Sequence, residues 1–134
     1  MEVYKALASD PRSVSSHEER ARIYFERGLV EKEIEAWRTV IELDPVRTSA
    51  RENLGHALVA AGRMADAAAE YRRVLDASPE TLTVLFNLAM IEMEAGNSQE
   101  ARRLWTRYLE QDPSGPWSEQ ARTALETLAK QGAQ

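Results

Sequence analysis

The two histidines, His17 and His56, are the residues best suited by type to metal binding or general-base chemistry. A zinc site takes three or four Cys, His or carboxylate ligands, several of them close together in the sequence. The chain has no cysteine, and its histidines fall in different parts of the sequence. We therefore predict no metal site and expect both histidines on the surface or in a groove.

The chain also lacks the residues that other common catalytic and cofactor-binding sites require. Without cysteine the chain has neither a thiolate nucleophile nor a disulfide. Gly28, Gly62 and Gly96 each stand alone rather than in a phosphate-binding loop. Carboxylates are plentiful, but neighbouring arginines at helical spacing make them ordinary solvated faces, and paired acids in acid–base catalysis remain the alternative. The sequence predicts no enzyme and no cofactor.

A repeat of 34 residues supplies the elements that must position the polar side chains. Three series of residues share this period: the glycines Gly28, Gly62 and Gly96, the prolines Pro11, Pro45, Pro79 and Pro113, and the aromatics Trp37, Tyr71 and Trp105. A fixed period of this length is typical of stacked supersecondary units rather than of one globular core. About three units are needed to bury a continuous core, and the chain has three.

The stretch from Thr48 to Thr81 shows one repeat most clearly. Its first helix carries Leu54, Ala57, Leu58 and Ala61 three or four residues apart, as one apolar face requires. Ser49 with Glu52 predicts a capping box at its start. Gly62 ends the helix where a left-handed residue is needed.

The second helix of this repeat is predicted to begin at about Met64 and to end before Pro79, which cannot continue a helix. Gly55 and Ala67 are small, so the backbones of the two helices can approach closely. Tyr71 then fills the space beside them.

This pattern resembles the tetratricopeptide repeat. Its signature places hold Leu54, Gly55, Ala67, Tyr71 and Pro79, whereas Arg51 and Leu58 replace the frequent Trp and Tyr. The resemblance covers about residues 14–115. It implies an all-α fold, a right-handed α-solenoid of three stacked helix–turn–helix units.

We expect a half-repeat helix at 1–13, repeats at 14–47, 48–81 and 82–115, and a capping helix at 116–134. Met1 to Ser9, with Val3 and Leu7 on one side, is either a native cap or the cut edge of a longer protein. Pro116 suits the first turn of the last helix.

The outer repeats depart from the pattern. Glu33 stands where Ala67 and Ala101 stand later, and Glu92 takes the place of Leu58. Terminal repeats are expected to be atypical. Two further helix starts are predicted, at Ser16 with Glu19 and at Asn97 with Glu100.

The composition of the chain limits the kinds of partner that it can bind. The net charge is −5 and no basic cluster occurs, which argues against nucleic acid or an anionic membrane surface as the ligand. No apolar run approaches the roughly 20 residues of a membrane span. Met1 to Asp10 does not resemble a secretory signal. Together with the absence of cysteine, this favours a cytoplasmic location.

Resemblance to the family implies a concave surface lined by the first helix of each unit. The candidate peptide-binding residues that map there are Glu18, Glu19, Arg22, Glu52, Asn53, His56, Phe86, Asn87, Met90 and Met93. Asn53 and Asn87 occupy matching places and resemble the asparagine ladder with which some family members hold a peptide backbone. Hydrogen bonding within the array is the alternative.

The charge pattern disfavours the carboxylate clamp of chaperone-binding relatives, because Glu18, Glu19 and Glu52 would repel a carboxylate. We expect instead a peptide segment with basic residues at one end and an apolar anchor near Met90 at the other. Packing of Phe86, Met90 and Met93 beneath Trp117 is the rival explanation.

The sequence therefore predicts a protein–protein interaction module or scaffold. One alternative is self-association of the chain through its terminal helices. Another is a regulatory fragment of a larger protein or enzyme.

Overall fold

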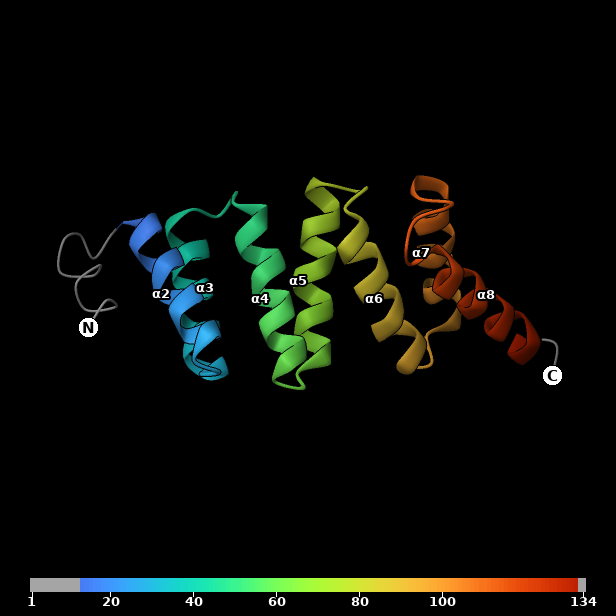
Figure 1. Cartoon of the computed structure of the whole chain (residues 1–134), viewed down its shortest axis with the longest axis horizontal. Coiled ribbons are helices and arrows are strands. Elements are labelled where there is room, and N and C mark those ends of the chain that lie inside the picture. Colours follow the sequence, from blue (N-terminus) through green and yellow to red (C-terminus); the bar gives the residue numbers. More distant parts are fainter. Residues whose placement is uncertain (1–12, 133–134) are drawn as a thin grey trace. The chain divides into compact units, whose positions relative to one another are not determined.

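The computed structural model describes residues 13–132, which form helices joined by short turns (Figure 1). The helices are α2 (Val14–Glu26), α3 (Val30–Leu43), α4 (Thr48–Ala60), α5 (Met64–Ala77), α6 (Leu82–Glu94), α7 (Ser98–Gln111) and α8 (Ser118–Gly132). These described residues contain no strand, and the predicted all-α class is confirmed. The helix expected at Met1 to Ser9 lies outside them.

The chain divides into two compact units, Met1–Val74 and Leu75–Gln134, which we call unit 1 and unit 2. The boundary falls within α5, so it coincides with none of the predicted repeat limits. Each predicted repeat nevertheless holds two helices, and the limits of the repeats stay a prediction.

In unit 1, α2 packs along α3 and α3 contacts α4. On α3, α4 and α5 the buried side chains include residues three or four apart, which is the spacing of one helical face. The buried apolar side chains of unit 1 are Ala21, Ile23, Ile34, Ala36, Trp37, Val40, Ala50, Leu54, Ala57, Leu58, Ala67, Ala68, Tyr71 and Val74. This buried face holds the helices together, since apolar burial is the main favourable term in folding.

The contact between α4 and α5 is made where a glycine faces an aromatic ring. A Cβ atom added to Gly55 would lie only 2.4 Å from Cε1 of Tyr71. The Tyr71 side chain is fully buried. The predicted close approach of these helices beside Tyr71 is confirmed.

The three repeated glycines end their helices in the same way. Gly28, Gly62 and Gly96 have φ angles of 71°, 77° and 83°, which strain any residue with a Cβ atom. At Gly62, its N–H donates to the carbonyl of Val59 and the N–H of Arg63 donates to that of Leu58. This pair of bonds defines a Schellman motif and confirms the predicted helix end.

Two predicted capping boxes are wrong. The cap of α2 is Ser13, whose side chain accepts a hydrogen bond of 3.2 Å from the N–H of Ser16, so the helix begins at Val14. Ser49 lies within the first turn of α4, whose N-cap is Arg47 without a side-chain capping bond. Either serine fits the preference for a cap, and packing of the hairpin decides which turn is the first.

At α7 the predicted helix start is correct, because Asn97 is the N-cap. Its side chain makes no capping bond, however. The amide nitrogen Nδ2 of Asn97 donates instead to Oε2 of Glu92, at 2.9 Å.

In unit 2, α7 packs against both α6 and α8. The fully buried Trp105 and Tyr108 lie at the centre of its core. The last helix begins at Ser118 rather than at Pro116, which lies in the preceding turn. Ser118 Oγ donates a hydrogen bond of 2.6 Å to the carbonyl of Asp112, and this bond closes the turn.

None of the helices described here has the length and apolar character needed to cross a membrane.

Candidate functional site

A pocket of about 330 Å³ lies in unit 1 and is bounded by three consecutive helices. Its lining residues are Arg22 and Phe25 of α2, Glu33 and Trp37 of α3, and Asn53 and His56 of α4. Each helix contributes two side chains three or four residues apart, the spacing that places them on one face. The structure thus brings together three predicted site residues, Arg22, Asn53 and His56.

The pocket has an aromatic wall that the sequence analysis missed. Phe25 is 68% exposed, which is unusual for such a large apolar side chain, and Trp37 beside it is almost completely buried. Spacing alone assigns Trp37 to the core and gives no sign that one edge of its ring borders a cavity. An exposed ring next to polar groups provides the mixed lining that is typical of ligand sites.

Glu33 is a buried carboxylate in this pocket. Its side chain occupies the place of an alanine in the other repeats, and the residue is only 6% exposed. Oε2 accepts a hydrogen bond of 3.0 Å from the indole nitrogen of Trp37. Burial raises the pKa of Glu33, while the hydrogen bond from Trp37 and the charge of His56 oppose the shift.

His56 is held in position by two partners. Its Nδ1 lies 2.6 Å from the hydroxyl of Tyr71, and its Nε2 lies 3.4 Å from Oε2 of Glu52. Each ring nitrogen of His56 therefore has one hydrogen-bond partner. Because Tyr71 is fully buried, this chain of bonds orients His56 at the pocket and does not present a nucleophile.

Asn53 and Asn87 are half-buried and have amides available for a ligand. Neither side chain makes a hydrogen bond with any other residue in the 13–132 range. The internal hydrogen bonding considered as the alternative is therefore not seen for them in that part of the chain. Asn53 lines the pocket in unit 1, and Asn87 belongs to α6 in unit 2.

The acidic residues predicted on α2 do not line this pocket. Glu18 accepts a bond of 2.6 Å from Arg47 and lies 4.0 Å from Arg22, so its charge is already paired within unit 1. Hydrogen bonds to Asp44 and to Glu18 raise the pKa of Arg47. Glu19 is exposed.

Both histidines are expected on the surface or in a groove, and a surface position is wrong for His17, which is 6% exposed. His17 lies four residues before the buried Ala21, on the inner face of α2. No group of three or more His, Asp or Glu residues suited to a metal ion occurs between residues 13 and 132.

In unit 2, the residues predicted to hold an apolar anchor are Phe86, Met90 and Met93, and they differ in how far they are buried. Phe86 lies within an aromatic cluster, with ring centres 5.0 Å from Trp105, 5.8 Å from Tyr108 and 5.2 Å from Trp117. This contact with Trp117 agrees with the rival explanation for Phe86. Met90 remains exposed and Met93 is half-buried.

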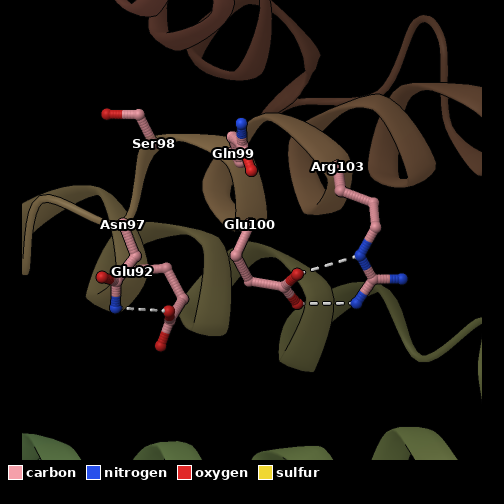
Figure 2. A pocket seen from close by; sticks show the side chains of 6 residues that line it. All are labelled: Glu92, Asn97, Ser98, Gln99, Glu100 and Arg103. Atoms are coloured by element: carbon pink, nitrogen blue, oxygen red, sulfur yellow. Dashed lines mark hydrogen bonds and ion pairs between the residues drawn. The ribbon is translucent and has the colours of Figure 1, made fainter.

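A larger cavity of about 590 Å³ lies at the turn between α6 and α7 (Figure 2). Its polar groups bond to one another: Arg103 donates to both carboxylate oxygens of Glu100 at 3.0 and 2.6 Å, and Asn97 donates to Glu92. The bonds to Glu100 raise the pKa of Arg103. This cavity contains no predicted site residue. Because these polar side chains are bonded to one another, they are less available to a ligand than those of the pocket in unit 1.

Helical hairpins with equivalent glycine ends and aromatic cores define an all-α solenoid of helical repeats. The tetratricopeptide repeat family matches residues 34–81 and 52–116, which together make up more than half of the chain. The chain therefore belongs to the tetratricopeptide repeat family, as its resemblance predicted.

Solved structures share this fold at low sequence identity. The crystal structure of MamA is 18% identical with a TM-score of 0.85, over 98% of this chain and 75% of that one. YrrB, titled a TPR protein with an unusual peptide-binding site, is 16% identical with a TM-score of 0.83, over 98% and 66% of the two chains.

A third similar structure is the first TPR of Spaghetti (RPAP3) bound to the HSP90 peptide SRMEEVD. It is 16% identical with a TM-score of 0.73, over 90% of this chain and 96% of that one. No curated protein matches the chain.

Proposed function

We propose that this chain is a protein-interaction module that holds a peptide segment of a partner protein in the pocket of unit 1. The observation that carries the proposal is the composition of that pocket. An exposed aromatic ring, an unengaged amide and two charged side chains from three helices meet around about 330 Å³. A pocket with this mixed lining can hold one side chain of a peptide and the backbone next to it, and it is less suited to the flat surface of a folded partner.

Asn53 is the residue proposed to contact the peptide backbone. Its amide can donate to a carbonyl and accept from an N–H of the same peptide. Its side chain bonds to no other residue of the described part of the chain, so a ligand would displace only water. His56 is its neighbour in the pocket and offers a second, pre-oriented polar edge.

Two of the similar proteins support binding of this type, because one is described as bound to a peptide and the other as having a peptide-binding site. The proposed ligand differs from a chaperone tail in its charge. Glu33 lines the pocket and Glu52 lies 3.4 Å from the ring of His56, so a partner segment with basic residues is favoured over an acidic one.

The proposal places the chain in the cytoplasm and assigns it no catalytic activity. Met90 and Met93 remain proposed apolar contacts for a longer segment, and Asn87 a second backbone contact. Self-association through the terminal helices and regulation of a larger enzyme are the competing functions. Sedimentation over a concentration series separates the first of these from peptide binding, since a strict monomer excludes it.

The experiment is a selection of random 16-residue peptides on the wild-type protein, followed by calorimetric titration of the enriched peptides. We expect Asn53→Ala to weaken binding by about thirtyfold, since the amide forms two bonds with the peptide and each net hydrogen bond contributes roughly 1 kcal/mol. The matched control is Gln120→Ala, which removes an exposed amide from α8 and should leave affinity unchanged. Peptides that bind both variants equally well would reject the pocket.

A further inference from the structure

One position distinguishes the first repeat from the other two. This position lies four residues before the aromatic residue that recurs every 34 residues. It holds Glu33 before Trp37, Ala67 before Tyr71 and Ala101 before Trp105. All three positions are buried, so the first repeat encloses a carboxylate where the others enclose a methyl group. Burying a carboxylate is costly unless it is paired and hydrogen-bonded.

The pairing of Glu33 is incomplete. Oε2 accepts the bond from Trp37 Nε1, but Oε1 has no hydrogen-bond donor among residues 13–132. No cationic side chain of that range forms an ion pair with Glu33. The arginine that lines the pocket, Arg22, lies 4.0 Å from Glu18 and is largely exposed.

The surroundings of Glu33 suit a cation with an apolar stem. The ring of Phe25 is exposed and lines the same pocket as the indole of Trp37. Aromatic faces attract ammonium and guanidinium groups, and they also pack against methylene groups. Burial raises the pKa of Glu33, the direction expected of a carboxylate that lacks its cation.

We propose that the pocket of unit 1 takes a lysine or arginine side chain of the partner segment, with its N–H group donating to Glu33 Oε1. Its methylene stem lies against Phe25 and Trp37. This inference rests on the proposed function and names the residue class that the pocket selects. It also assigns a specificity role to Glu33, which the sequence marks only as a departure from the recurrent alanine.

The test uses the indole N–H signal of Trp37 in an NMR titration of the whole chain. The signal reports directly on the pocket because this N–H donates to Glu33. Trp105 and Trp117, both in unit 2, give two internal reference signals. The probes are Nα-acetyl-lysine methylamide, whose side-chain ammonium group is free, and its norleucine analogue, which has the same carbon chain without the ammonium group.

We expect the lysine probe to shift the Trp37 signal saturably, with an affinity at least tenfold above that of norleucine. Glu33→Gln keeps an oxygen for the Trp37 bond but removes the charge, and should reduce the affinity for lysine to the norleucine value. Glu35→Gln removes the same charge from an exposed position on α3 and should change little. Titrations at about 0.15 M salt screen the general attraction to an acidic chain.

Equal shifts from lysine and norleucine would overturn the inference, and so would unchanged lysine binding by Glu33→Gln. The selected peptides separate this failure from failure of the proposed function. Peptides that depend on Asn53 but tolerate norleucine for every lysine or arginine would leave the binding module intact and reject the role of Glu33. An acidic side chain preferred at the pocket would also reject it.

Discussion

Replacing Gly55 with alanine tests the packing between α4 and α5 at its closest point. The added Cβ would lie 2.4, 2.8 and 3.0 Å from Cε1, Cδ1 and Cζ of Tyr71. These atoms belong to the middle of a rigid ring that is fully buried. The ring is also held at its hydroxyl, 2.6 Å from Nδ1 of His56, so it has little freedom to move aside.

Two effects of opposite sign decide the result. Alanine favours a helix over glycine by about 1 kcal/mol. Overpacking of a core costs about 1–3 kcal/mol, and displacement of Tyr71 would add the loss of a hydrogen bond worth roughly 1 kcal/mol. We therefore expect Gly55→Ala to lower the free energy of unfolding by about 1–3 kcal/mol.

Urea denaturation followed by circular dichroism measures this change, and a double-mutant cycle assigns its cause. Tyr71→Leu removes the ring, so Gly55→Ala in that background should be neutral or stabilising by up to about 1 kcal/mol. Gly132→Ala is the control, because its Cβ would lie 3.6 Å from Arg102, an ordinary contact. Stabilisation of the wild-type chain by Gly55→Ala would refute the close packing of α4 on Tyr71.

Two further changes test the helix ends and the buried acid. Gly62→Ala should destabilise the chain by about 1–2 kcal/mol, because the φ angle of 77° at this position strains any residue with a Cβ atom. Gly62→Asn should cost less, since asparagine tolerates a positive φ better than alanine does. Equal melting temperatures for the wild type and both variants would contradict this prediction. Glu33→Gln should raise the free energy of unfolding at pH 7. Burial raises the pKa of Glu33 above 4.5, so the folded state binds its proton more tightly, and the advantage of glutamine should shrink as the pH falls toward 4.5. A difference between Glu33→Gln and wild type that does not vary with pH would contradict the second prediction.

The sequence predicts the fold well because each repeated residue has a local physical role. Gly62 is needed at a positive φ, and Tyr71 is needed where Gly55 leaves space, so their 34-residue period directly marks helix ends and contacts. The starts of helices are less determined. Ser13 and Ser16 can both cap α2, and only the geometry of the turn selects Ser13.

The site is predicted only in part, for a related reason. Arg22, Asn53 and His56 are expected there because the family resemblance implies that the first helix of each repeat lines the concave surface. Trp37 and Glu33 sit at core positions, and nothing in their spacing shows that the core opens into a pocket beside them. The one available signal was the replacement of a recurrent alanine by Glu33.

That replacement argues for function on energetic grounds. An alanine at this place is sufficient for the fold, as Ala67 and Ala101 show by their complete or nearly complete burial. A carboxylate there loses hydration, and the bond from Trp37 and the charge of His56 offset this loss only in part, because the pKa of Glu33 is still raised. The folded chain is therefore less stable than it could be. Departures from local consistency of this kind are expected where a chain binds something. A cation from a partner would supply the missing pairing, so the same residue that weakens the free module would strengthen its complex.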